Sequence, residues 1–167
     1  MTNLHYPACI RELYESEIFG EAVSLALVEA AKNERDKYHF GTLLQLETET
    51  KARLRPFLRK YDLSLSEEMD LPDIEAIVAG YRAANWEDFM GGLVATVKPF
   101  LARFEEIASV GPTEDKDVLE SMVRHEAAIL KWLEIERSGG AESSLDDLIA
   151  QLQYPLPRPT SQAAAHQ

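Results

Sequence analysis

Residues 43–54 read LLQLETETKARL, and this stretch decides the fold class. It belongs to a longer run in which apolar residues recur at intervals of three and four, which predicts an amphipathic helix over residues 36–60. Glu47 falls on the apolar stripe of this helix, where a core residue is expected. An ionised carboxylate in a core is costly unless it is paired, hydrogen-bonded or bound to a cation, so Glu47 indicates a buried polar site.

The same periodicity predicts three more long helices and two short helical segments. The long ones cover residues 8–33, 86–109 and 114–137, and the short ones lie between Pro72 and Asn85 and over residues 145–152. Short links join the first to the second long helix and the third to the fourth, which is typical of antiparallel hairpins, whereas a long crossover separates the two hairpins. We therefore expect an all-α four-helix bundle with a long crossover and a short C-terminal helix.

Length and charge limit the possible functions. The chain has 167 residues, 46% of them hydrophobic, which is enough for one domain with a sizeable core. We expect this domain to span residues 1–153, and the proline-rich tail over residues 154–167 to be disordered. The net charge of −12 argues against nucleic acid or an anionic membrane as a partner.

The cysteine content and the N-terminus indicate a cytoplasmic protein. Cys9 is the only cysteine, so the chain has no internal disulfide and no thiolate metal site, and a reducing compartment is the default. The N-terminal residues lack a basic region followed by an apolar core, and no stretch of the sequence is apolar for about 18 residues. A homodimer formed through a helix face is a further expectation.

Acidic residues lie on the apolar stripes of three different predicted helices. Glu21, Glu47 and Glu126 are each near the midpoint of a helix, so antiparallel packing would place them at one level. Glu17 lies one turn before Glu21 on the same face and can add an oxygen. His125 is rotated by about 100° from Glu126, so only one of the two is expected to be central. We hypothesise that the three acids bind a metal ion, with Glu17 and His125 as auxiliary ligands.

Three segments resemble the ferritin-like four-helix bundle superfamily: FGEAVSLALVEAA at 19–31, LLQLETETKARL at 43–54 and VRHEAAILKWLEIE at 123–136. The likeness covers about residues 8–138. In that superfamily each half of the bundle gives one lone Glu and one Glu-x-x-His pair, which together hold two iron or manganese ions for oxygen chemistry. The resemblance implies that Glu21 is the lone Glu of the first helix, and that Glu47 and Glu126 are the acids of the two pairs.

The chain departs from this ligand pattern at three positions. Thr50 follows Glu47 at the place of the first histidine, and Ile129 follows Glu126 at the place of the second. The middle of the third long helix offers Thr96 and no carboxylate. The remaining set is rich in oxygen and poor in nitrogen, which favours manganese, magnesium, calcium or ferrous iron over zinc or copper.

Two classes of function remain open from the sequence. The first is a metal-binding protein with iron or manganese and oxidoreductase-type chemistry. The second is a metal-free bundle that binds a small apolar molecule or a partner protein without catalysis. In the second case Thr50, Tyr14 and a protonated His125 would hydrogen-bond the carboxylates. Pairing along one helix, as between Glu47 and Lys51, is a common structural role for such acids.

Overall fold

The computed structural model describes residues 5–160, and its regular elements are helices. The long helices are α1 (Tyr6–Ala30), α2 (Glu34–Lys60), α4 (Trp86–Val110) and α5 (Lys116–Arg137); the short elements are α3 (Ile74–Ala83), α6 (Asp146–Ile149) and a 3₁₀ turn at Thr113–Asp115. The prediction of an all-α fold with four long helices is therefore confirmed. No helix within residues 5–160 has the length and apolar character needed to cross a membrane.

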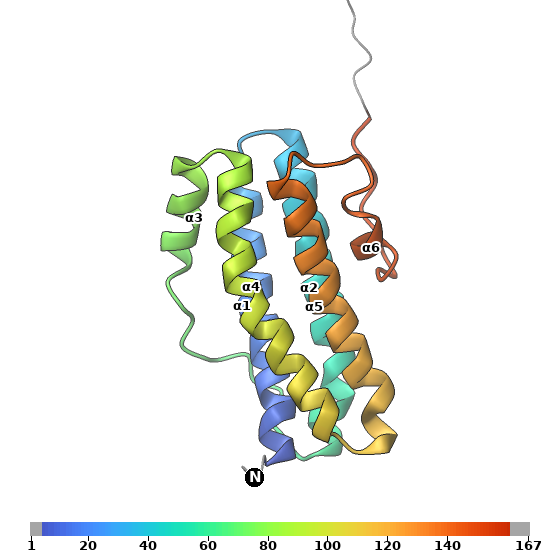
Figure 1. Cartoon of the computed structure of the whole chain (residues 1–167). Helices are drawn as coiled ribbons and strands as arrows, with labels where there is room; N and C mark the ends of the chain where they lie inside the picture. Colours follow the sequence, from blue (N-terminus) through green and yellow to red (C-terminus); the bar gives the residue numbers. More distant parts are fainter. Residues whose placement is uncertain (1–4, 161–167) are drawn as a thin grey trace, which may run out of the picture.

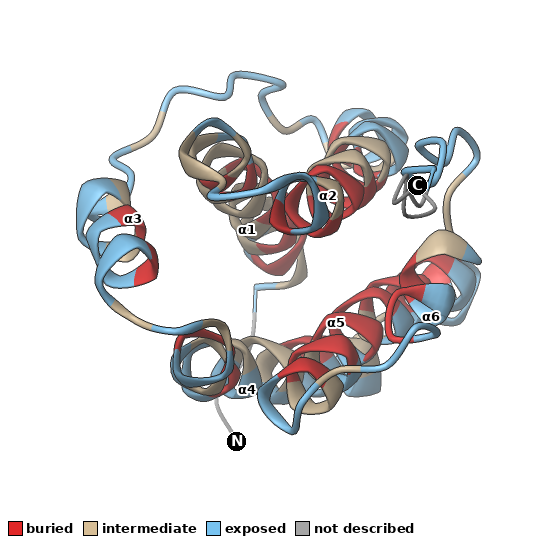
Figure 2. Cartoon of the chain, turned by 90° about the horizontal axis from the view of Figure 1, so that it is seen from above, coloured by how far each residue is buried: buried red, intermediate tan, exposed pale blue. Residues whose placement is uncertain are grey.

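The long helices pack as two antiparallel pairs, α1 with α2 and α4 with α5. Seen from above, the two pairs form two layers whose buried faces are turned toward each other (Figure 2). The link between the pairs runs along the outside of the bundle from one end to the other, so that α2 and α4 point in the same direction (Figure 1). Within this link, α3 packs on α1 and α4.

Side-chain caps fix where the helices begin. The Asn33 side chain accepts a hydrogen bond from the backbone N–H of Asp36 at 2.8 Å, which starts α2 at Glu34. Helix α1 consequently ends at Ala30, so the predicted helix end at residue 33 is wrong by three positions. The predicted break between the two helices had included residues that in fact form the first turn of α2.

The apolar core consists of two clusters, one toward each end of the bundle. Three long helices contribute residues to both clusters. The boundary between the clusters lies between Ile18 and Leu27 on α1, between Leu46 and Leu54 on α2, and between Met122 and Ala128 on α5. Buried polar side chains occupy the level between the clusters on all three helices. The bundle therefore contains a polar layer near its middle.

Polar contacts hold the crossover against the first hairpin. Arg11 donates to the backbone carbonyl of Ser64 at 3.0 Å. Glu67 accepts hydrogen bonds from Lys51 at 2.8 Å and from Tyr14 at 3.1 Å. Tyr14 therefore bonds the crossover, whereas the sequence had suggested that it would donate to a carboxylate of the buried cluster.

The first residues of the C-terminal tail contact the bundle. The backbone N–H groups of Gln153 and Tyr154 donate to the Glu49 carboxylate at 2.7 and 2.9 Å. Arg158 pairs with Asp146 at 2.9 Å. The predicted tail begins at residue 154, and its part over residues 161–167 lies outside the described residues.

Candidate metal centre

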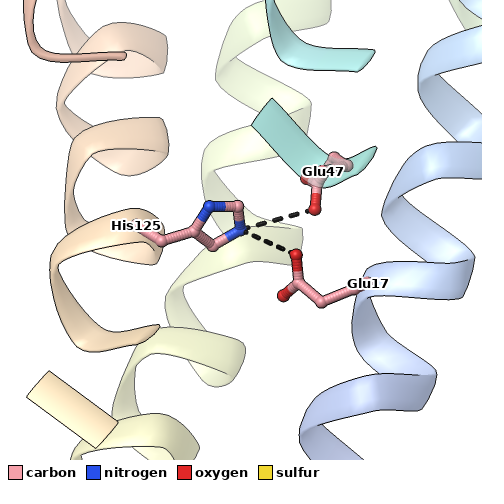
Figure 3. A group of neighbouring side chains, drawn as sticks. All are labelled: Glu17, Glu47 and His125. Carbon is pink, nitrogen blue, oxygen red and sulfur yellow. Dashed lines mark ion pairs between the residues drawn. The ribbon is translucent and has the colours of Figure 1, made fainter. Parts of the chain in front are cut away.

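Glu17, Glu47 and His125 converge in the polar layer from α1, α2 and α5 (Figure 3). The His125 Nε2 atom lies 3.2 Å from Glu17 Oε2 and 3.4 Å from Glu47 Oε2. One candidate ligand atom from each residue lies within 4.8 Å of the others. All three side chains are buried, so neither water nor distant counter-ions can screen their charges.

Glu126 adds a third carboxyl group to this layer. Its Oε2 atom lies 3.9 Å from His125 Nε2. The expectation that only one of His125 and Glu126 would be central is wrong, because their exposed fractions are 0% and 7%. The layer therefore holds three carboxyl groups and one imidazole.

Two atoms of the group have no hydrogen-bond partner among the described residues. They are Glu17 Oε2 and His125 Nε2, and both are fully buried. A buried polar atom without a partner costs about 1–3 kcal/mol. Because the two atoms face each other, a proton or a cation bound between them would satisfy both.

Thr50 and Arg53 contact the other side of the imidazole. Thr50 Oγ1 lies 3.2 Å from His125 Nδ1, and an Arg53 guanidinium N–H donates to the same oxygen at 3.0 Å. When Nδ1 carries a proton, it donates to Thr50 and leaves the Nε2 lone pair directed at the carboxylates. Metal-bound histidines are commonly oriented by such a contact on their second nitrogen.

Burial and mutual repulsion raise the proton affinity of the cluster. Burial, followed by the charge of Glu47, raises the pKa of Glu17 well above its usual range. Burial raises the pKa of Glu126 to about 7, against the opposing effect of His125. Burial alone would lower the pKa of His125, but Glu47 and Glu126 offset it and raise that pKa. The cluster therefore retains protons when no cation is present.

Gly20 makes room for the Glu47 carboxyl group. A Cβ atom at this position would lie only 2.6 Å from Glu47 Cδ and 2.7 Å from both carboxylate oxygens. Any larger residue would push the carboxyl group away from His125.

We expect Gly20→Ala to be less stable than Gly92→Ala by about 1–3 kcal/mol, because both changes favour the helix equally but only the first overpacks a tight interior contact. It should also weaken any ion binding that uses Glu47. Gly92→Ala is the matched control, since a Cβ there meets nothing within 4 Å and alanine favours a helix. Urea unfolding of both variants measures the difference; equal stability would show that the Glu47 carboxyl group moves aside at no cost.

Glu21 and Thr96 lie apart from the imidazole. Glu21 accepts a hydrogen bond from Thr48 at 2.6 Å and pairs with Lys51, and its side chain is 26% exposed. The expected pairing of Lys51 with Glu47 is replaced by this contact. Thr96 is an exposed residue of α4. The structure therefore brings Glu17, rather than Glu21, to His125.

Comparisons with known protein families, curated proteins and solved structures found no match for this chain. The site must therefore be interpreted from its own donor atoms. They do not fit the two-metal set of the ferritin-like superfamily, because the layer has one imidazole and α4 contributes no carboxylate to it. They do fit a single ion, because two carboxylates and the Nε2 atom converge and two of the converging atoms are unpartnered.

Proposed function

We propose that the protein is a divergent ferritin-like bundle that binds one divalent cation, manganese or ferrous iron, between Glu17, Glu47 and His125. The observation that carries this proposal is the pair of buried, unpartnered atoms Glu17 Oε2 and His125 Nε2, which face each other at 3.2 Å. A cation between them would satisfy both atoms and offset the repulsion between the carboxylates.

The donor set determines which ions are suitable. Carboxylate oxygens with a single imidazole suit manganese and ferrous iron. Zinc and copper(I) are instead favoured by sites that contain thiolates. Thr50 supports this assignment, because its contact with Nδ1 leaves Nε2 available as a ligand. The pairing of two antiparallel hairpins across a long external crossover supports the ferritin-like class.

An ion of this kind, when bound, supplies Lewis-acid or redox chemistry, and on this ground we propose an oxidoreductase-type activity. A neighbouring carboxyl group can hold a proton. Glu126 lies 3.9 Å from His125 Nε2, and burial raises its pKa to about 7 in the metal-free protein, so it can hold a proton near neutral pH that a bound cation would displace. We assign Glu17, Glu47 and His125 as ligands and Glu126 as a fourth ligand or proton carrier.

Metal titration of two glutamine variants tests the proposal. Manganese added at about 100 times its dissociation constant should stabilise the wild-type protein by about 2.7 kcal/mol, because the ion binds the folded state alone. Glu17→Gln should abolish this gain, since it removes a charged ligand. Glu21→Gln should keep it, because Glu21 lies one turn away and bonds Thr48 and Lys51. Thermal unfolding, with equilibrium dialysis and elemental analysis for stoichiometry, measures the effect; ferrous iron is tested anaerobically.

The Glu21→Gln variant also distinguishes the proposed site from the ligand set predicted from the sequence, which included Glu21. Loss of binding in Glu21→Gln with retention in Glu17→Gln would place the ion at Glu21 instead. If neither manganese nor ferrous iron stabilises the wild-type protein at millimolar concentration, the cluster is a metal-free proton network and the proposal fails.

A further inference from the structure

A cavity of about 90 Å³ lies directly against the carboxylates of the polar layer. Glu17, Glu47 and Glu126 form one wall. The other walls are mostly apolar and come from α1, α4 and α5; they include Val23, Leu27, Leu93, Val97, Ile129 and Trp132. The cavity therefore joins a hydrophobic space to the proposed ion site.

A second hollow of about 230 Å³ lies beside the cavity, at the surface between α1, α4 and the crossover. Both hollows are lined by Ser16, Phe19 and Phe100, so these three residues stand at the junction between them. The outer hollow carries Glu12 and Arg103, which pair with each other at 2.8 Å. Among the described residues that line this hollow, Arg103 is the only basic one, and its pairing with Glu12 reduces the attraction for an anionic ligand.

We infer that the cavity binds a small, uncharged, largely apolar molecule, which enters between Phe19 and Phe100. This inference rests on the proposed function only for the role of the carboxylate wall, where the molecule would meet the bound ion. Binding of the molecule to the apolar walls does not require a bound metal ion.

The dimensions and charges of the cavity define the class of ligand. Its volume lies between the roughly 10–15 Å³ that one water requires and the roughly 150 Å³ of a cavity that holds benzene, which corresponds to about two to four carbon atoms. Three carboxyl groups at its inner end and a net charge of −12 disfavour a carboxylate ligand. The apolar walls disfavour a hydrated cation of this size. A hydroxyl group at one end of the ligand would be accommodated, since it can donate a hydrogen bond to a carboxylate oxygen.

Binding is tested on the metal-free protein with xenon and 1-propanol as probes and propionate as the charged control. We expect saturable shifts of the methyl NMR signals of Leu93, Val97 and Ile129 with both neutral probes, and none with propionate. Val97→Phe should weaken the apparent affinity by at least about tenfold, because the ring fills the cavity. Val110→Phe is the matched control, since Val110 is on the same helix and is 51% exposed.

The outcomes distinguish this inference from the proposed ion site. Absence of saturable shifts in the wild-type protein, or their retention in Val97→Phe, would overturn the inference whatever the metal titration shows. Leu93→Phe provides a second cavity-filling variant if Val97→Phe does not fold. Phe100→Ala should shorten the lifetime of the bound probe by opening the junction; an unchanged lifetime would overturn the entry route. Loss of ion binding with normal probe binding would contradict the proposed function alone.

Discussion

Replacing Glu126 with glutamine is expected to stabilise the metal-free protein by about 3 kcal/mol above pH 7 and to change its stability little near pH 4. Burial raises the pKa of this carboxyl group to about 7, against an ordinary value of 4.5. Each unit of pKa shift corresponds to about 1.4 kcal/mol between the folded and unfolded states. Glutamine cannot ionise, so it avoids the cost of a buried charge and keeps the shape of the side chain.

The sign of the pH dependence follows from proton linkage. Between about pH 4.5 and pH 7 the folded protein holds the Glu126 proton while the unfolded chain has lost it. The Glu126 contribution to the stability of the metal-free protein should therefore fall as the pH rises through this window, so the stability of Glu126→Gln relative to wild type should rise. Burial lowers the pKa of His39 to about 4, which acts in the opposite direction in both proteins and cancels in this comparison. Urea unfolding at several pH values measures the difference. Glu21→Gln, which removes a partly exposed acid that bonds Thr48 and Lys51, is the comparison variant.

Manganese should offset part of the stability that the wild-type protein loses when Glu126 ionises. Ionised carboxylates bind a cation better than protonated ones, so the stabilisation by manganese should grow as the pH rises from about 5 to 8. A Glu126→Gln variant that is less stable than wild type above pH 7 in the absence of metal would show that the Glu126 charge is compensated by a contact other than a proton.

Removal of Glu136 should have the largest effect on folding, because its carboxylate joins three parts of the bundle. Its side chain is fully buried and accepts hydrogen bonds from Arg35 at 2.6 Å, from the Trp86 indole N–H at 2.7 Å and from Ser144. We expect Glu136→Ala to lower the free energy of unfolding by about 2–4 kcal/mol, because two neutral donors lose their acceptor at about 1–3 kcal/mol each, whereas the half-exposed Arg35 can return to water. The Trp86 and Ser144 donors would be left without their acceptor.

Glu134 provides the matched control two residues away on the same helix. Its side chain is 44% exposed and pairs with Lys98 only at 3.8 Å, so Glu134→Ala should change the free energy of unfolding by less than about 0.5 kcal/mol. Chemical unfolding of both variants measures the contrast. A loss below about 1 kcal/mol for Glu136→Ala would mean that water replaces the carboxylate among its donors.

The sequence by itself determined the helices and the level of the polar layer. Helical periodicity depends on residues three and four positions apart, so it is visible without any tertiary contact. Glu47, Glu126 and His125 were found because each interrupts or adjoins an apolar stripe near the middle of its helix. The long crossover was likewise evident from the length of polar sequence between the hairpins.

The choice between Glu17 and Glu21 depended on the position of one turn. Helix α1 ends at Ala30 and α2 begins at Glu34, so Glu17 and Glu47 are each 15 residues from position 32, the middle of that turn. Residues equidistant from the turn of an antiparallel hairpin lie at the same height. The predicted helices at 8–33 and 36–60 place the turn about two residues later, which favours Glu21 as the neighbour of Glu47. The signal that could have corrected it was Asn33, a strong helix N-cap.

Only the tertiary structure decided which atoms meet within the polar layer. The contact of Thr50 with His125 joins residues 75 positions apart in the chain, and the fit of Gly20 against Glu47 depends on how closely two helices approach. The carboxylate of Glu136 and its donors from α2 and α4 are brought together in the same way. Periodicity specifies the face of a helix on which a residue lies, but it carries no information about the axial offset between helices. Side-chain packing fixes that offset, and with it the unpartnered atoms and the cavity beside them.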